Sequence, residues 1–491
     1  MDQIAAGRLP VVVIGAGPVG LAAAAHLLER GLEPLVFEAG PDAGAAIGGW
    51  AQVRLFSPWR YNIDAASRRL LKSAGWQEPA LDSLPTGAEL VRDYLGPLAQ
   101  LPDVAASLRT SSRVVSVSRK GLDKTRSKDR GDTPFLVRVL RTDGTTEDHL
   151  ARAVIDASGT WTSPNPLGQA GLPAPGEAEA RAAGLITDPL PDVAGRERSR
   201  FAGRHVLVVG AGHSAANTLL SLSELAAEAP GTRITWAVRG SSASSAYGGG
   251  ALDGLPARGA LGTRLRSLVE TGALDVLTSF TITGFATSGR LEVRGSTPGG
   301  ARSLSVDLLI PATGFRPNLD ILRELRLDLD PAVEAPKALG PLIDPEFHSC
   351  GTVEPHGRAV LAHPEQDFYI VGMKSYGRAP TFLMATGYEQ VRSIAAALAG
   401  DRRAADQVEL VLPQTGVCSS DIGASRDAPS PAAAPQADTS GCGTASVPVE
   451  AGSGGTESPA EEESVACCGP TPVLLGFPTG FAHGRSAERD G

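Results

Sequence analysis

The sequence contains no apolar run long enough to cross a membrane and no start typical of a secreted protein. Its most apolar stretches have the length of strands and are interrupted by Gly or Pro, well short of the ~20 residues that a membrane helix requires. The opening residues Met1–Ile4 lack the basic start and long apolar run of a secretory signal. These absences predict a cytoplasmic protein that does not enter a membrane.

An excess of positive charge is also missing. The net charge is −9, whereas general binding to nucleic acid or to an anionic membrane needs clustered Lys and Arg. We therefore expect neither a nucleic acid nor a membrane as a partner. A local basic pocket is still compatible with this charge.

Cysteine is scarce, with five residues in the chain and four of them in its last quarter. This distribution gives no disulfide framework. No Cys-x-x-Cys pair exists anywhere, and Cys350 stands alone. The neighbours Cys467 and Cys468, with Cys418 before them, could bind a soft metal or metalloid ion, because thiolates favour soft acceptors. The alternative is that they are reactive thiols without a function.

The length of 491 residues allows two to three domains of about 100–200 residues each. Residues 419–470 are rich in Ala, Ser, Gly, Pro and Glu. Such a composition buries too little apolar surface to offset an ordering cost of ~1–2 kcal/mol per residue. We therefore predict that residues 407–491 form a mostly disordered tail that contains the late cysteines.

A strand–turn–helix–strand unit opens the chain. Residues 9–14 have the apolar character of a buried parallel strand, and the turn Gly-Ala-Gly-Pro-Val-Gly at 15–20 follows at once. Residues 21–30 read as an Ala-rich helix, and the next strand, 34–37, stops at Glu38. This order and spacing are typical of a dinucleotide-binding unit.

The same strand–turn–helix–strand unit occurs a second time. Residues 205–209 form a β-branched strand, Gly-Ala-Gly-His-Ser-Ala at 210–215 forms the turn, and 216–229 is helical. The next strand, 234–238, stops at Arg239. Two copies of the unit imply two bound nucleotides.

Each unit is followed by a three-stranded meander and by a strand that ends in a small-residue glycine turn. The expected meander strands are 113–117, 135–140 and 147–150 in the first half, and 275–285, 290–294 and 303–306 in the second. The fold class is therefore α/β, with two dinucleotide-binding Rossmann-like domains of three-layer ββα type, the second inserted in the first. The predicted boundaries are 1–195 and 307–406 for the first domain and 196–306 for the inserted one.

The glycines of the first turn have separate tasks. Gly15 permits a tight turn, Gly17 lets the backbone approach a pyrophosphate, and Gly20 lets helix pack on strand. The helix that begins near Pro18 offers free amides and the positive end of its dipole. Glu38 can accept hydrogen bonds from both ribose hydroxyls and would repel a 2′-phosphate, so this site suits FAD or NAD. The alternative is a structural glycine-rich turn without a ligand.

The second turn differs where the adenosine would lie. A guanidinium at Arg239, taken as the counterpart of Glu38, can pair with a 2′-phosphate, which favours NADPH over NADH. The alternative for Arg239 is a solvated surface charge. We expect His213 to position the cofactor or to pack, in preference to a catalytic role. The predicted NADPH-binding residues are Gly210, Gly212, His213, Ser214, Ala215 and Arg239.

At this point the sequence resembles flavoproteins with two dinucleotide folds, the group that includes flavin-containing, Baeyer–Villiger and N-hydroxylating monooxygenases. The resemblance covers residues 9–402 and rests on the two glycine turns, on Gly-Gly-Trp at 48–50 and on Ala-Thr-Gly-Phe-Arg-Pro at 312–317. Residues 53–62, 376–383 and 412–419 are similar to flavoproteins of actinobacterial arsenic-resistance operons.

The resemblance implies FAD in the first domain, NADPH in the second, and a small-molecule substrate with molecular oxygen. Reduced flavin in this group reacts with oxygen to give a C4a-hydroperoxide, and the protein supplies orientation and dryness. By the same resemblance, arsenic chemistry is implied only through operon context. Further FAD-binding residues are expected at Trp50, Asp156, Gly159, Gly314 and Gly372.

One feature departs from the monooxygenase pattern. The usual Phe-x-Gly-x-x-x-His fingerprint before the second nucleotide fold is absent, since residues 192–201 contain no histidine. This keeps a second hypothesis open, an NADPH reductase or oxidase that passes electrons to a metalloid, a quinone or a partner. A third hypothesis is a redox sensor that holds nucleotides without turnover.

Two segments are expected beside the flavin ring, 48–62 and 372–378. The predicted catalytic residues are Asn62 and Arg60 in the first segment, and Lys374 and Arg378 in the second. Interface ion pairs and turn chemistry are the alternative roles for Asn62 and Arg60. The helix predicted at 381–398 would direct its first amides and its dipole at the flavin.

Overall fold

The computed structural model describes residues 9–248, 250, 253–345, 353–380 and 382–410. The chain divides into two compact units, Met1–Ser425 and Arg426–Gly491, and everything below concerns the first. The predicted tail from residue 411 on lies outside the described residues, as do all five cysteines. Within the described ranges, no helix combines the length and the apolar character that a membrane crossing requires.

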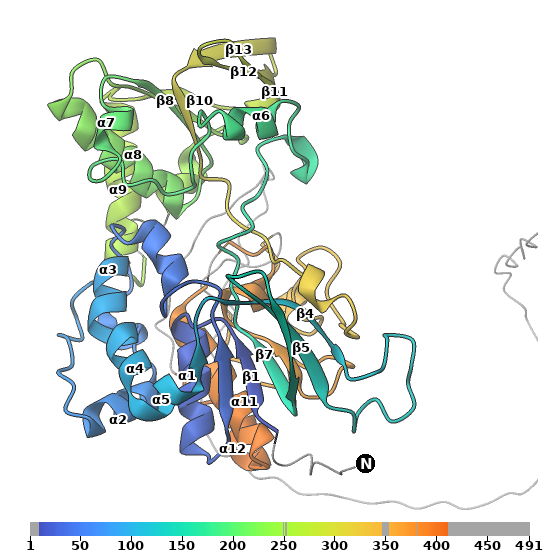
Figure 1. Cartoon of the computed structure of the whole chain (residues 1–491). Coiled ribbons are helices and arrows are strands. Elements are labelled where there is room, and N and C mark those ends of the chain that lie inside the picture. The colour runs from blue at the N-terminus through green and yellow to red at the C-terminus, as the bar shows by residue number, and fades with distance from the viewer. Residues whose placement is uncertain (1–8, 249, 251–252, 346–352, 381, 411–491) are drawn as a thin grey trace, which may run out of the picture. The chain divides into compact units, whose positions relative to one another are not determined.

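The first domain is built on a five-stranded parallel sheet in the order β15-β7-β1-β2-β3. Figure 1 labels β1 and β7 of this sheet. Ile14 of β1 pairs with Phe37 of β2 on one side and with Asp156 of β7 on the other, and Asp156 pairs with Ile370 of β15. The carboxyl ends of these strands therefore meet in one row. The elements are β1 (Val11–Ile14), α1 (Pro18–Glu29), β2 (Pro34–Phe37), β3 (Leu108–Arg109), β7 (Ala153–Asp156) and β15 (Phe368–Ile370).

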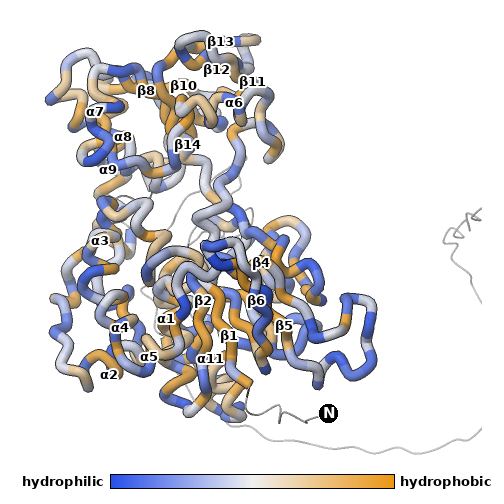
Figure 2. Tube along the Cα trace, viewed as in Figure 1, coloured by the Kyte–Doolittle hydropathy of each residue, from blue (hydrophilic) through white to orange (hydrophobic). Residues whose placement is uncertain are grey.

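Alternate residues of β1 point to the two faces of the sheet. Val11 and Val13 pack with the helical layer, which includes α1 and α11 (Met384–Leu398). Val12 and Ile14 pack against the antiparallel meander on the other face, whose strands are β4 (Ser112–Arg119), β5 (Phe135–Arg141) and β6 (Thr146–Ala151). Figure 2 shows the central strands as a continuous hydrophobic band, as expected for a sheet covered on both faces.

The inserted domain repeats this plan. Its parallel sheet has the order β10-β9-β8-β14, and its antiparallel meander is β11-β12-β13. The predicted fold class is confirmed. The elements are β8 (His205–Val209), α8 (His213–Glu228), β9 (Arg233–Ala237), α9 (Pro256–Glu270), β10 (Asp275–Leu277), β11 (Thr281–Thr287), β12 (Leu291–Thr297), β13 (Gly300–Val306) and β14 (Leu308–Pro311).

The insertion is longer than the predicted residues 196–306. On its early side, Leu167 and Ile186 are buried in the core of the inserted domain together with Leu309. On its late side, β14 pairs with β8 and completes the sheet. The packing therefore assigns about residues 167–311 to the second domain. The strand expected at 275–285 is also two strands, separated by Ser279 with a left-handed φ of 51°.

The two connections between the domains run beside each other. The backbone N–H of Asn165 donates to the carbonyl of Gly314 (2.9 Å), and its Nδ2 donates to the carbonyl of Thr313 (3.0 Å). The Thr313 hydroxyl returns a bond to the Asn165 carbonyl (2.8 Å). Gly314, which the sequence predicted to bind FAD, adopts φ +81°. Its backbone conformation therefore shapes the second connection between the domains.

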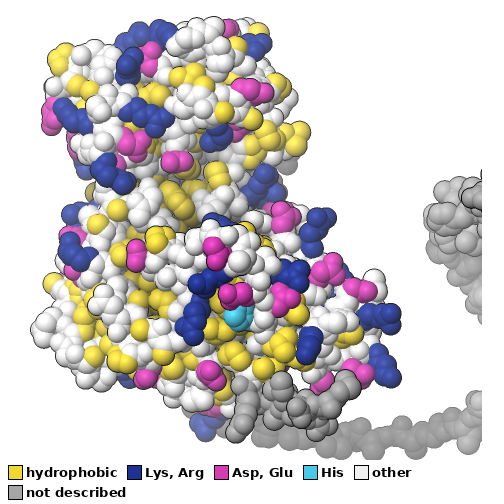
Figure 3. Space-filling model, in the orientation of Figure 1, with side chains coloured by type: hydrophobic (Ala, Val, Ile, Leu, Met, Phe, Trp, Pro, Cys, Tyr) yellow, Lys and Arg dark blue, Asp and Glu magenta, His cyan; other side chains and the backbone are white. Residues whose placement is uncertain are grey.

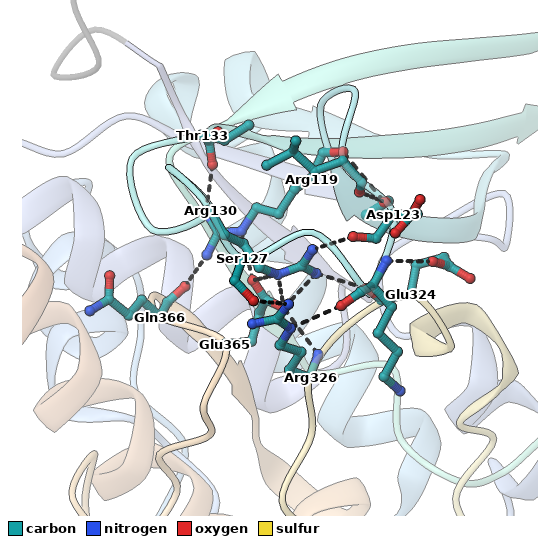
Figure 4. A network of polar contacts seen from close by, with 12 residues as sticks. Arg119, Asp123, Ser127, Arg130, Thr133, Glu324, Arg326, Glu365 and Gln366 are labelled. Atoms are coloured by element: carbon teal, nitrogen blue, oxygen red, sulfur yellow. Dashed lines mark hydrogen bonds and ion pairs between the residues drawn. The ribbon is translucent and has the colours of Figure 1, made fainter.

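A buried ion network joins the first meander to the segment before β15 (Figure 4). Glu365 is 2% exposed and forms ion pairs with Arg119 and Arg130, each at 2.8 Å. Burial alone would raise the pKa of Glu365, but bonds from Arg130, from the Arg326 amide and from Arg119 lower it below its usual value. The network lies at the amino end of β15, the end of the strand opposite to the row of carboxyl ends.

On the face that Figure 3 shows, Lys and Arg side chains are interspersed with Asp and Glu.

The remaining helical segments connect or cover these sheets. The segments are η2 (Ala45–Trp50), η3 (Trp59–Tyr61), α2 (Ala65–Ser73), α3 (Gly87–Leu90), η4 (Val91–Leu95), α4 (Gly96–Gln100), α5 (Pro102–Ser107), η5 (Gln169–Gly171), α6 (Glu177–Ala182), α7 (Arg198–Phe201), η6 (Ser244–Tyr247), η8 (Asp320–Leu322), α10 (Gly340–Ile343), η9 (Gly372–Tyr376) and α12 (Arg402–Asp406).

Candidate functional site

The turn after β1 is closed by protein on both sides and open in its middle. A Cβ on Gly15, which has φ +97°, would lie 2.8 Å from the Ala157 carbonyl oxygen, and one on Gly20 would lie 1.9 Å from the Gly15 carbonyl oxygen. A Cβ on Gly17 would meet no atom within 4 Å. Packing therefore explains Gly15 and Gly20, whereas Gly17 leaves room for a ligand against its backbone.

Helix α1 begins directly at this opening. Gly17 is its N-cap in an extended conformation, and Pro18 occupies the first turn, where a missing N–H costs nothing. No acidic residue lies in the first turn, and no side chain caps it. Free amides and the positive end of the helix dipole therefore face the open side of Gly17, which suits a pyrophosphate.

Glu38 is half-buried beside this turn. Its Oε2 accepts the amide of Ala16 and its Oε1 accepts the amide of Gly40, both at 2.8 Å. Each carboxylate oxygen can accept a further hydrogen bond. Glu38 therefore shapes the loop and keeps acceptor capacity for the hydroxyls of a ribose.

A second turn follows β7, next to the first. Asp156 is fully buried, and its Oδ1 accepts the amide (3.0 Å) and the hydroxyl (2.6 Å) of Ser158. Its Oδ2 accepts the ammonium of Lys374 (2.7 Å), which is itself 1% exposed. Gly159 has φ +69° and open space where a Cβ would stand. We call the turn at residues 15–20, together with the start of α1, the first cradle, and the corresponding turn at 210–215 with the start of α8 the second cradle. The turn at Gly159 thus presents a bare backbone beside the first cradle.

The turn after β15 is held by a residue that the sequence analysis did not name. Gly372, with φ +67°, donates its amide to Oε1 of Gln390 on α11 (2.8 Å). Nε2 of Gln390 donates to Ser375 Oγ and reaches His356 Nε2, both at 3.0 Å. Burial chiefly lowers the pKa of His356, so its neutral ring can accept this bond. The sequence gives no clear signal for this role, because the helix neighbours of Gln390 at i−4 and i+3, Thr386 and Ser393, are also polar.

The turn after β8 repeats the geometry of the first. A Cβ on Gly210, with φ +133°, would lie 2.0 Å from the Ala312 carbonyl oxygen, whereas one on Gly212 would meet nothing within 4 Å. Gly212 is the N-cap of α8, whose first turn has no acidic residue. The indole of Trp236 donates to the Gly210 carbonyl (2.7 Å). Ala215 is fully buried, which explains why a small residue is needed there.

Arg239 lies one residue beyond the counterpart of Glu38, not at it. The amide of Gly15 donates to Phe37, and the amide of Gly210 donates to Ala237, so Val238 corresponds to Glu38. Val238 is 3% exposed, whereas Arg239 is exposed. The guanidinium of Arg239 is therefore accessible to a phosphate from solvent.

His213 and Ser214 begin α8. The His213 ring lies 5.1 Å from the ring of Phe56. Burial, and next the charge of Arg258, lower the pKa of His213 to about 4. The imidazole is therefore neutral near pH 7, which fits packing and positioning better than proton transfer.

The four predicted catalytic side chains are occupied within the fold. Arg60 pairs with Asp82, and Arg378 pairs with Glu334 (2.7 Å). Asn62 is 1% exposed and exchanges two hydrogen bonds with Ser57. Lys374 pairs with Asp156, as described above. Each of the four thus has its own separate partner, and their catalytic roles stay predictions.

Trp50 has a visible packing role. A Cβ on Gly87 would lie 2.9 Å from its indole ring, so Trp50 packs closely on the start of α3. Trp161 is the matching neighbour of Gly49, at 2.8 Å from the position of a Cβ there. Contact of Trp50 with a flavin stays a prediction.

Comparison with known proteins agrees with this geometry. A family model described as "FAD dependent oxidoreductase" matches residues 10–88. The chain is 27% identical over 321 residues to the bifunctional thioredoxin reductase/thioredoxin of Mycobacterium leprae. It is 28% identical over 138 residues to the ferredoxin–NADP reductase of Paramagnetospirillum magneticum. The matches cover 65% and 28% of this chain, and 54% and 36% of the two relatives, so the chain spans about half the length of the first.

Solved structures share the fold over most of the chain. The bacillithiol disulfide reductase of Bacillus cereus has a TM-score of 0.59 at 18% identity, over 80% of this chain and 99% of that one. The cadaverine monooxygenase of Erwinia amylovora, bound to FAD, has 0.53 at 14%, over 84% and 99%. The ornithine hydroxylase of Pseudomonas aeruginosa has 0.52 at 15%, over 80% and 99%. The chain therefore has the two-domain fold that these disulfide reductases and monooxygenases share.

Proposed function

We propose that this chain is an NADPH-dependent FAD oxidoreductase, with FAD on the turn after β1 and NADPH on the turn after β8. One observation carries the proposal. In both turns a Cβ on the first glycine, Gly15 or Gly210, would collide with protein backbone. The middle glycine, Gly17 or Gly212, has open space there and lies at a helix N-terminus. Two independent cradles for a pyrophosphate support two dinucleotides.

The charges beside the cradles support different adenosines. Glu38 would repel a 2′-phosphate, whereas the exposed Arg239 would attract one through a charge-assisted hydrogen bond. The family model for FAD-dependent oxidoreductases covers the first cradle and not the second. Glu38 therefore suits the adenosine of FAD, and Arg239 suits that of NADPH.

FAD would supply the redox chemistry, by accepting a hydride and passing electrons to oxygen or to another acceptor. The protein's part is to orient and shield it. Asp156 fixes the turn that bears Gly159, and Gln390 fixes the turn that bears Gly372. Our preferred activity is oxygen transfer to a small molecule, because residues 9–402 resemble monooxygenases and the sequence contains no Cys-x-x-Cys pair.

The second candidate is a reductase that passes electrons to a disulfide, a quinone or a partner. The missing fingerprint histidine in residues 192–201 and the sequence similarity to a bifunctional thioredoxin reductase/thioredoxin favour it. The absence of any Cys-x-x-Cys pair from the sequence weighs against it. A link to arsenic resistance has no support among the similar proteins, and we do not propose one.

The test is reconstitution with FAD followed by NADPH oxidation under two regimes. In air, cadaverine and ornithine serve as probe substrates, with peroxide and hydroxylated product measured in parallel. Without oxygen, a low-molecular-weight disulfide and a quinone serve as acceptors. Oxygen transfer predicts product in air and no turnover of the disulfide or quinone; rapid turnover without oxygen supports the reductase. A protein that binds neither FAD nor NADPH would refute both.

A further inference from the structure

Lys374 is a buried charge for which packing gives no reason. Its ammonium, on the turn after β15, contacts Asp156 Oδ2 at 2.7 Å and Ser158 Oγ at 3.1 Å. The side chains of Lys374 and Asp156 are 1% and 0% exposed. Apolar residues of similar volume often replace such a pair without loss of stability. A need for stability therefore does not account for the pair.

The position of the pair is more informative. Ile14, Asp156 and Ile370 stand in one row at the carboxyl ends of adjacent parallel strands, the edge where open parallel sheets bind ligands. The residue after Asp156, Ala157, touches the cradle, because its carbonyl oxygen is 2.8 Å from the position of a Cβ on Gly15. The pair therefore lies next to the first cradle.

Asp156 has a local task that needs an oxygen acceptor. Its Oδ1 holds both the amide and the hydroxyl of Ser158 and so sets the turn that presents Gly159. As a lone carboxylate it would also place a negative charge next to a site for a pyrophosphate, where repulsion is strong because water is excluded. The ammonium of Lys374 cancels that charge and shares the Ser158 hydroxyl.

We propose that Lys374 is a positioning and charge-compensating residue of the FAD site. It neutralises Asp156, and Asp156 in turn holds the Ser158–Gly159 turn against the cofactor. The inference rests on the proposed function, in that it assumes FAD on the first cradle. It assigns to Lys374 an effect on cofactor affinity in place of a contact with substrate.

The test compares FAD affinity and apoprotein stability in matched variants. Fluorescence titration gives the Kd for FAD, and urea unfolding gives the stability of each apoprotein. K374M should bind FAD at least about tenfold more weakly than the wild type, because Asp156 is then unpaired. K374M/D156N should bind within about threefold of the wild type, because the introduced side-chain amide carries no charge and its oxygen still accepts from Ser158. E365Q removes a buried charge at the far end of β15, and it should lower stability without weakening FAD binding.

The outcomes separate the inference from the proposed function. If K374M binds FAD as tightly as the wild type, or if the double variant binds as weakly as K374M, the inference is overturned. If K374M does not fold, K374M/D156N is compared with K374M/D156L, which lacks the acceptor for Ser158; equal affinities overturn the positioning role. A wild-type protein that does not bind FAD overturns the proposed function itself.

Discussion

Replacing Gly17 by Ala should separate cofactor binding from folding. Gly17 has φ −77° and ψ −173°, which any residue adopts, and a Cβ there would meet no protein atom within 4 Å. The apoprotein should therefore be unchanged or more stable by about 0.4–1 kcal/mol, because Ala restricts the unfolded chain. A bound pyrophosphate would meet the new methyl group, and such overpacking costs about 1–3 kcal/mol, or about 5- to 150-fold in Kd.

Gly20→Ala is the matched control. Its Cβ would lie 1.9 Å from the Gly15 carbonyl oxygen, so this variant should lose apoprotein stability, whereas Gly17→Ala should not. Urea unfolding of both apoproteins and fluorescence titration with FAD make the comparison. If Gly17→Ala binds FAD as the wild type does, or if it destabilises the apoprotein as Gly20→Ala does, the open cradle is not the cofactor site.

Three further predictions concern charged and titrating groups. Arg239→Gln should raise the Kd for NADPH by about 10- to 150-fold, the loss of a charge-assisted bond of about 1.5–3 kcal/mol, and should leave NADH binding unchanged; calorimetric titration with both nucleotides checks it. Glu365→Gln leaves Arg119 and Arg130 without their buried partner and should cost about 3–5 kcal/mol of unfolding free energy, measured with urea; a loss below about 1 kcal/mol, within the range of exposed pairs, would contradict it. Because the pKa of His213 is about 4 in the fold and 6.5 ordinarily, its stabilising contribution is lost as pH falls from 6.5 toward 4. His213→Gln should therefore reduce the pH dependence of the unfolding free energy over that window, while the other buried histidines, such as His363 with a pKa of about 4, keep part of it. An unchanged pH slope would contradict burial of His213 as a neutral ring.

Local signals in the sequence predicted the sheets well. The strands 34–37 and 205–209 were expected with the same ends that the structure gives them, because apolar, β-branched runs stop at glycine turns and polar residues. The meanders were also predicted, except that residues 275–285 hold two strands. The break falls at Ser279, whose left-handed backbone is set by its tertiary position and has no glycine or proline to announce it.

What the sequence could not predict depends on long-range contacts. Leu167 and Ile186 belong to the inserted domain because of what they pack against. The Gly- and Pro-rich residues 164–176 lie at this boundary, but such a composition is also that of an ordinary loop and does not say which domain the segment joins. The partner of Lys374 lies 218 residues earlier in the chain. The shift of Arg239 by one position became visible only from strand register. The cradles themselves were predictable, because their glycines and helix starts are adjacent in sequence.

The most direct test of two separate cradles is calorimetric titration of the apoprotein with FAD and with NADPH, in the wild type, Gly17→Ala and Gly212→Ala. Our account predicts one FAD and one NADPH per chain, with Gly17→Ala weakening only FAD and Gly212→Ala weakening only NADPH. Competition between FAD and NADPH for a single site, or one variant weakening both equally, would contradict it.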